Sequence, residues 1–117
     1  MLRIDSQNPV ATALSERLQD RVDFDALPEE LCVVIGGDGF MLESIRTVGA
    51  GHVFLGLNAG RVGFLLNDAE DFESTIEALA GHRWQVHTFP RLAMEATHTE
   101  GTPTSEAMAV NDVYLER

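Results

Sequence analysis

Hydrophobic residues recur every three or four positions in two parts of the chain, which is the spacing of one face of an α-helix. The first stripe predicts a helix over about 9–21, with Asn8 as its N-cap. The second predicts a helix with Asn67 or Asp68 as its N-cap and Gly81 in the C′ position after its end. The apolar members of the two stripes are Val10, Leu14 and Leu18, and Phe72, Ile76 and Leu79.

Uninterrupted apolar runs predict strands that are covered on both faces. Such runs occupy 31–35 and 52–57, and a shorter apolar segment at 2–4 predicts a third strand. Between the two long runs, the segment 40–48 has the character of a helix and ends at the glycine cluster of 49–51. Helix and strand therefore alternate along this part of the chain.

The pattern changes towards the C-terminal end. Strands are predicted at 84–89, 92–97 and 107–115, with turn residues before the last and no helix among them. Alternation followed by strands alone predicts an α/β domain over 1–82, with a parallel sheet and flanking helices. Residues 83–117 would then form the first strands of an antiparallel β domain, which we expect to be incomplete.

Composition narrows the classes of partner. The 117 residues carry 19 acidic and 8 basic side chains, and the net charge of −11 disfavours nucleic acid or an anionic membrane as the main partner. All the basic residues are arginines, and the lack of lysine excludes a Walker-type phosphate loop and Schiff-base chemistry. The histidines do not have the spacing of metal ligands.

Cys32 is the only cysteine, so the sequence predicts neither a disulfide framework nor a cysteine-based metal cluster. Its place inside an apolar run favours a buried, unreactive thiol. No charged-then-apolar leader opens the chain, and no apolar run approaches the length of a membrane span. We therefore expect a cytoplasmic protein.

Three glycines and one aspartate follow the apolar run at 31–35, in the order Gly36, Gly37, Asp38 and Gly39. One interpretation is a phosphate-binding turn, in which glycine amides and a helix N-terminus face phosphate oxygens. Asp38 would then accept a proton from a hydroxyl group or hold Mg²⁺, because its charge repels phosphate. The other interpretation is a tight turn with Asp38 as a helix N-cap. Three glycines beside a carboxylate favour the first.

A second glycine-containing loop follows the strand at 52–57. It contains Asn58, Gly60 and Arg61, which are expected at the same sheet edge as Asp38 because the carboxyl ends of parallel strands meet there. Arg61 is the best candidate in this loop for contact with an anion. An ordinary strand-to-loop turn with a surface arginine fits the spacing equally well.

Asn111 and Asp112 lie within an apolar strand, so one of the two side chains is expected to face inward. An inward polar group needs a polar partner. A ligand hydroxyl or base edge is one such partner, and a β-bulge or turn is the slightly favoured explanation for the pair alone.

In this order, the three polar motifs resemble those of the NAD kinase family, the inorganic polyphosphate/ATP-NAD kinases. That family has Gly-Gly-Asp-Gly, then a motif close to Asn-x-Gly-x-Leu-Gly-Phe-Leu, then Asn-Glu or Asn-Asp early in a β domain. The matching residues here are 36–39, 58–65 and 111–112, within a resemblance that covers Leu31–Leu115. The first motif also occurs in diacylglycerol kinase, sphingosine kinase and phosphofructokinase relatives, so the specificity comes from all three together.

The resemblance implies that Asp38 is the catalytic base for the adenosine 2′-hydroxyl of NAD and that Gly39 lines the NAD site. Asn111 and Asp112 match the pair that binds NAD. The implied reaction moves the γ-phosphoryl group of ATP, or a phosphoryl group of polyphosphate, to this hydroxyl with Mg²⁺ and yields NADP. Among the protein groups, Asp38 is the one candidate ligand for the metal. Further candidate contacts to phosphate or nucleotide are Gly36, Gly37, Phe40, Asn58, Gly60 and Arg61.

The sequence departs from the family pattern in two ways. Phe40 stands where threonine usually follows the glycine turn. The chain also ends soon after Asp112, whereas family members continue through a β domain that adds NAD contacts and helps to form homo-oligomers. We therefore expect an N-terminal portion of an NAD kinase, with the fold that NAD kinases share with diacylglycerol kinases.

Two other classes stay open. A non-catalytic nucleotide-binding or oligomerisation module, or an inactive fragment of the family, would bind ligand without turnover. A lipid or sugar kinase would share the glycine turn, but in lipid kinases of this type an Asn-Glu pair follows it closely. This chain has Met41–Ser44 at that place, which argues against a lipid kinase.

Overall fold

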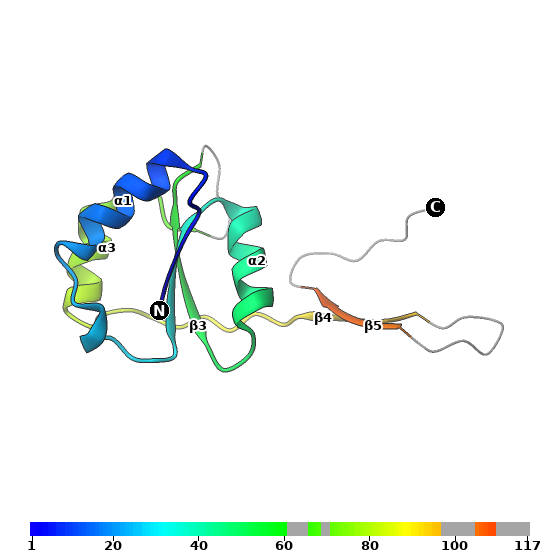
Figure 1. The fold of residues 1–117 in the computed structure, drawn as a ribbon. Helices are drawn as coiled ribbons and strands as arrows, with labels where there is room; N and C mark the ends of the chain where they lie inside the picture. Colours follow the sequence, from blue (N-terminus) through cyan, green and yellow to red (C-terminus); the bar gives the residue numbers. More distant parts are fainter. Residues whose placement is uncertain (61–65, 69–70, 97–104, 110–117) are drawn as a thin grey trace. The chain divides into compact units, whose positions relative to one another are not determined.

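The structure is a computed structural model that describes residues 1–60, 66–68, 71–96 and 105–109 of the chain. The chain divides into two compact units, Met1–Val86 and His87–Arg117 (Figure 1). Within the described residues, no helix is both long enough and apolar enough to cross a membrane.

A parallel three-stranded sheet forms the centre of the first unit. Its strands are β1 (Leu2–Ile4), β2 (Leu31–Gly36) and β3 (Val53–Asn58), in the order β1-β2-β3. Gly36 at the end of β2 pairs in register with Asn58 at the end of β3. The strands predicted at 2–4, 31–35 and 52–57 are therefore confirmed to within one residue.

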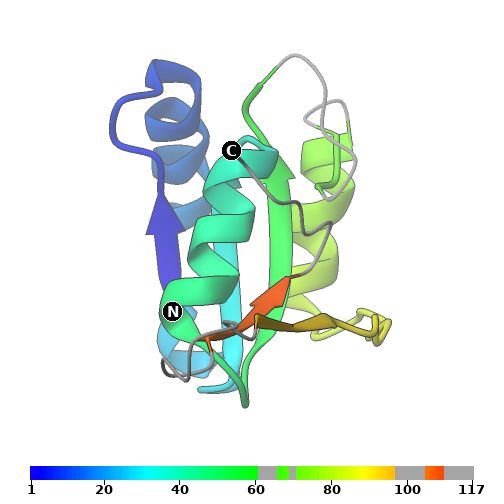
Figure 2. The ribbon, with the colours of Figure 1, turned by 90° about the vertical axis from the view of Figure 1, so that its right-hand side faces the viewer.

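Helices cover both faces of this sheet. On one face lie α1 (Pro9–Gln19) and α3 (Phe72–Ala80), and on the other lies α2 (Asp38–Val48) (Figure 1, Figure 2). A short 3₁₀ helix, η1 (Phe24–Ala26), precedes β2. The predicted α/β fold with a parallel sheet and flanking helices is confirmed.

Strand β2 is an uninterrupted apolar run because all six of its residues are buried. Cys32 and Val34 pack on the α2 side, and the opposite side, towards α1 and α3, carries Leu31, Val33 and Ile35. Burial raises the pKa of the Cys32 thiol, and the positive charges nearby oppose this effect only in part. The predicted buried thiol is confirmed, and a thiol with a raised pKa is a poor nucleophile.

The helices of the α1/α3 face pack through the predicted stripes with one change. In α3, Phe72, Ile76 and Leu79 are each 2% exposed, as predicted. In α1, Leu14 and Leu18 are buried, but Val10 is 51% exposed and Ala11 takes its place on the buried face. The positions 11, 14 and 18 follow the three-and-four spacing of one helix face more closely than 10, 14 and 18.

Charged groups link the end of α1 to the start of α3 at the surface. Glu73 accepts hydrogen bonds from Arg17, at 2.8 Å, and from Arg21. The pKa of the Glu73 carboxyl group is lowered, mainly because of the hydrogen bond from Arg21. The guanidinium carbon of Arg17 also lies 4.7 Å from the centroid of the Phe72 ring. Because exposed ion pairs contribute little stability, the packing of these helices depends mainly on the buried stripes.

Two helix ends differ from prediction at α3. The helix begins at Phe72 with Asp71 as its N-cap, so the expected caps at Asn67 or Asp68 are wrong. Asn67 instead pairs with the end of β3, where its backbone N–H and its side-chain amide both donate to the carbonyl of Gly56, at 2.8 and 3.0 Å. This hydrogen bonding to the strand takes the place of a capping role.

At the other end of α3, Gly81 was expected in the left-handed C′ position, but its φ is −89° and it is the C-cap. His82 adopts the left-handed conformation instead, with φ of 53°. The backbone N–H groups of His82 and Arg83 donate to Leu79 and Ala78, which is the Schellman arrangement. The imidazole of His82 stacks on the indole of Trp84, with centroids 5.7 Å apart.

The predicted strand at 84–89 is wrong, because residues 83–91 have no regular secondary structure. Trp84 packs against the core of the first unit, whereas Phe89 is 77% exposed. Alternation of residue types is not enough to make a strand when no neighbouring strand supplies hydrogen bonds.

In the second unit, β4 (Leu92–Ala96) and β5 (Ser105–Ala109) form an antiparallel pair, with Leu92 opposite Ala109. The strand predicted at 92–97 is confirmed over its described residues. The strand predicted at 107–115 begins earlier, at Ser105, and everything after residue 109 lies outside the described residues.

Candidate functional site

The glycine turn joins the end of β2 directly to the start of α2. Gly36 is the last residue of the strand, Gly37 is the N-cap of the helix, and Asp38 is its first residue. The interpretation of Asp38 as N-cap is therefore wrong, and the helix begins two residues before the predicted residue 40. Asp38 is partly buried and lies in the first turn, where the helix dipole favours negative charge.

The three glycines of this turn differ in the space around them. A Cβ on Gly36 would lie 2.8 Å from Cδ1 of Phe40, so a larger residue there would displace the ring. A Cβ on Gly37 or on Gly39 would have no heavy atom within 4 Å. Gly37 and Gly39 therefore leave open space beside Asp38 that a ligand can approach.

The Asn58 loop lies at the same edge as the glycine turn, as predicted. The backbone N–H of Ala59 donates to the carbonyl of Gly36 at 2.8 Å. Asn58 is 6% exposed, and its Oδ1 accepts a hydrogen bond from the N–H of Gly60 at 2.8 Å. A Cβ on Gly60 would lie 4.0 Å from Cα of Gly37, so the two glycine segments are neighbours. Of the predicted site residues, Arg61, Asn111 and Asp112 lie outside the described residues.

Asn8 ties the loop after β1 to the loop after β3. Its Oδ1 caps α1 by accepting from the N–H groups of Val10 and Ala11, as predicted. Its Nδ2 donates to the carbonyl of Ala59 at 3.1 Å. The N–H of Asp5 donates to the carbonyl of Ile35 at 3.0 Å, so the loop after β1 also touches the end of β2. Sequence patterns reveal the cap but not this second, long-range bond.

Arg3 is a residue of this region that the sequence did not single out. Its Nε donates to Oγ of the fully buried Ser44 at 3.0 Å, and its Cζ lies 5.7 Å from the centroid of the Phe40 ring. Strand alternation explains the placement, because Leu2 and Ile4 face α1 while Arg3 between them faces α2. Arg3 therefore joins β1 to α2.

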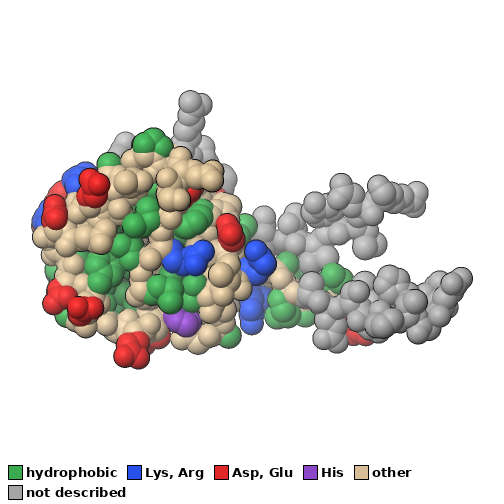
Figure 3. All heavy atoms as spheres, in the orientation of Figure 1, with side chains coloured by type: hydrophobic (Ala, Val, Ile, Leu, Met, Phe, Trp, Pro, Cys, Tyr) green, Lys and Arg blue, Asp and Glu red, His purple; other side chains and the backbone are tan. Residues whose placement is uncertain are grey.

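The acidic residues that the structure describes in the first unit are spread over it. On the face shown in Figure 3, acidic side chains are scattered over the first unit. Among the residues that the structure describes, no group of three or more His, Cys, Asp or Glu side chains could hold a metal ion. A divalent cation at the glycine turn would have Asp38 as its carboxylate there.

Curated proteins that are similar to this chain share one name, NAD kinase. The chain is 36% identical over 116 residues to an NAD kinase of Caulobacter vibrioides, an alignment that covers 96% of the chain and 42% of that relative. Over 116 residues it is 35% identical to an NAD kinase of Mesorhizobium japonicum, with 97% and 44% covered. The chain belongs to the NAD kinase family. An NAD kinase of Levilactobacillus brevis is 30% identical over 123 residues, with 96% of this chain and 44% of the relative covered. No protein-family model matches the chain.

The match concerns the N-terminal portion of the NAD kinases. The chain spans 42% and 44% of the length of the first two relatives, so it is less than half as long as they are. Within this portion the glycine turn, the Asn58 loop and the loop after β1 meet at one edge of the sheet. This edge is the candidate site of this NAD kinase family member.

Proposed function

We propose that this chain takes part in the phosphorylation of NAD to NADP. The observation that carries the proposal is the turn 36–39 between β2 and α2, with Asp38 in the first turn of the helix. Relatives that are named NAD kinase over nearly the whole chain support it. The phosphoryl group would come from ATP or polyphosphate, and the cytoplasm is the compartment we propose.

Asp38 would act as general base. Its carboxylate would orient the adenosine 2′-hydroxyl of NAD and accept its proton as the new O–P bond forms. At the same time the bond between the γ-phosphorus and the oxygen of the leaving ADP would break. A general base contributes about 10²- to 10⁴-fold to such a step, and positioning and charge neutralisation contribute the rest.

The backbone around Asp38 suits a ligand with phosphates. The N–H groups at the start of α2 and the open space at Gly37 and Gly39 would allow phosphate oxygens to approach closely. Mg²⁺ commonly binds through one or two carboxylates together with substrate phosphates, and Asp38 fits that donor set. When bound, the cation would neutralise charge on the transferred group. We propose that Asn111 and Asp112 bind NAD and that Arg61 contacts phosphate.

A second candidate function is nucleotide binding without catalysis. The specific observation in its favour is the open space at Gly37 and Gly39 at the start of α2, which suits phosphate binding whether or not a transfer follows. Such a module would bind NAD or ATP at the same edge but would form no NADP.

One assay separates the two functions. The chain is incubated with NAD and Mg²⁺ and with either ATP or polyphosphate, and NADP is measured by a coupled NADP-specific dehydrogenase. We expect NADP to accumulate and chelation of the cation to stop it. Binding of NAD in a calorimeter without any NADP would instead assign the chain as a binding module. Absence of both binding and product would refute both functions.

A further inference from the structure

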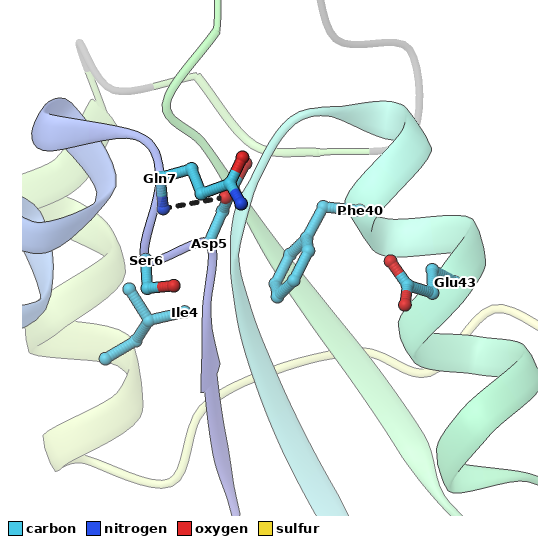
Figure 4. Close-up of a pocket in the computed structure, with 6 residues that line it drawn as sticks. All are labelled: Ile4, Asp5, Ser6, Gln7, Phe40 and Glu43. Atoms are coloured by element: carbon cyan, nitrogen blue, oxygen red, sulfur yellow. Dashed lines mark hydrogen bonds between the residues drawn. The ribbon is translucent and has the colours of Figure 1, made fainter.

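A pocket opens between the loop that follows β1 and the first turns of α2 (Figure 4). Its volume is about 380 Å³, and it lies wholly within the first unit. One wall comes from the end of β1 and its loop, and the other comes from α2. The lining residues are Ile4, Asp5, Ser6, Gln7, Phe40 and Glu43.

The position of this pocket in the sheet is one where α/β proteins bind ligands. The chain leaves β1 for α1 on one face and leaves β2 for α2 on the other face (Figure 2). Two neighbouring loops that depart to opposite sides leave a crevice at the carboxyl edge, and ligands of open α/β sheets bind in such crevices. The pocket lies at this crevice, beside the glycine turn.

The chemistry of the lining selects against phosphate. It offers two carboxylates, a hydroxyl, an amide and one aromatic ring, and the six lining residues include no Lys, Arg or His. Asp5 and Glu43 would repel a polyphosphate chain, but they can accept hydrogen bonds from neutral hydroxyl groups. The ring of Phe40 offers a flat surface for an aromatic base. A nucleoside, with ribose hydroxyls and a base, matches both features.

The two α2 residues of the pocket are well placed for this role. Phe40 and Glu43 are three positions apart on the helix, and both project towards the side of β1 (Figure 4). The Phe40 ring has two close neighbours that limit its movement: a Cβ on Gly36 would lie 2.8 Å from its Cδ1, and Cζ of Arg3 lies 5.7 Å from its centroid. Glu43 is exposed and ready to accept a bond, whereas Asp5 already accepts one from the N–H of Gln7 at 3.2 Å.

We propose that this pocket binds the nucleoside part of a nucleotide substrate, with ribose hydroxyls donating to Glu43 and Asp5 and the base against Phe40. The inference rests on the proposed function and adds a subsite to it. The nucleoside can come from the phosphoryl donor ATP or from NAD. Polyphosphate has no nucleoside. If the pocket serves the phosphoryl donor, ATP would therefore make contacts there that polyphosphate cannot make.

The test is a set of binding titrations on the chain by calorimetry, with adenosine, ATP, NAD and inorganic tripolyphosphate as separate probes. The variant Glu43→Gln is expected to weaken adenosine and one or both nucleotides by about 10-fold, the effect of losing a hydrogen bond to a charged group. Phe40→Leu is expected to weaken the same ligands. Tripolyphosphate should bind Glu43→Gln as well as the unchanged chain or slightly better. The matched control is Glu16→Gln, which removes the same charge from the exposed surface of α1.

The direction in which Glu43→Gln changes the affinity for each ligand tests the proposed nucleoside subsite. If Glu43 were only part of an acidic surface, removing its charge would tighten ATP and tripolyphosphate alike and leave adenosine unaffected. That result, or unchanged adenosine binding in both pocket variants, would overturn the proposal, as would a chain that binds neither adenosine nor nucleotide. Weakening of ATP but not NAD would identify the donor as the source, and the reverse would identify the acceptor. The two failures are distinguishable, because unchanged adenosine binding in both pocket variants refutes only this subsite, whereas nucleotide binding without NADP in the kinase assay refutes only catalysis.

Discussion

Replacing Asp38 by asparagine is expected to lower the rate of NADP formation by about 10²- to 10⁴-fold, the range that a general base contributes. The change keeps the shape of the side chain but removes the group that accepts the proton of the 2′-hydroxyl. Because asparagine can still accept a hydrogen bond from that hydroxyl, the dissociation constant for NAD should change only a few-fold. The measurement is kcat and KM in the coupled assay, together with NAD binding by calorimetry.

The control for this prediction is Asp71→Asn. Asp71 is the N-cap of α3, so the change also removes one negative charge at the start of a helix, but it lies outside the glycine turn. Its rate of NADP formation should equal that of the unchanged chain. Equal losses in both variants would show that charge at helix starts, and not a base at Asp38, controls the rate. An active Asp38→Asn variant would refute the role of Asp38 outright.

Replacing Gly36 by alanine is expected to lower the free energy of unfolding by about 1–3 kcal/mol, the usual effect of adding atoms to a packed site. The new Cβ would lie 2.8 Å from Cδ1 of Phe40 and 3.1 Å from its Cβ, so the ring or the start of α2 must move. Movement of Phe40 would also disturb the pocket, and adenosine should bind more weakly. Urea denaturation measures the first effect and calorimetry the second.

Two further variants make this prediction specific. Gly39→Ala also adds a methyl group to the turn, but apart from the adjacent residues and the backbone of α2 no heavy atom lies within 4 Å of the new Cβ. It should leave stability unchanged or raise it by up to about 1 kcal/mol, because alanine favours a helix over glycine. Adding Phe40→Ala to Gly36→Ala removes the 2.8 Å contact with Cδ1 and leaves only the 3.1 Å contact with Cβ, so the double variant should lose less stability than the two single changes together. Additive losses would mean that the collision is not the cause.

The elements predicted best are those whose pattern comes from burial. Strand β2 is recognisable because both of its faces are covered, so no polar residue interrupts 31–35. The stripe on α3 is recognisable because one helix face packs against the sheet. The meeting of Gly36 and Asn58 follows from the same logic, since each comes at the carboxyl end of a buried parallel strand.

The elements predicted poorly depend on backbone hydrogen bonds, which hydrophobic spacing does not reveal. The first residues of α2 are Asp38 and Gly39, which add nothing to an apolar stripe, so the pattern begins only at Phe40. His82 adopts the left-handed conformation beside a glycine that is better suited to it, next to the indole of Trp84. The sequence does not predict the pocket, because Asp5 and Glu43 are far apart in sequence and neither belongs to a recognisable motif.

The placement of α1 and α2 on opposite faces of the sheet determines the handedness of the two β–α–β crossovers. In Figure 2 the strands run upward, β1, β2 and β3 follow from left to right, and α2 lies towards the viewer. The β2–α2–β3 crossover is therefore right-handed. The connection from β1 through α1 to β2, whose helix lies behind the sheet, is left-handed, a hand found in only about 2% of parallel crossovers. With the usual hand, α1 would share the face of α2, and the loops after β1 and β2 would leave in the same direction. The crevice that holds the pocket therefore exists because of this uncommon left-handed crossover.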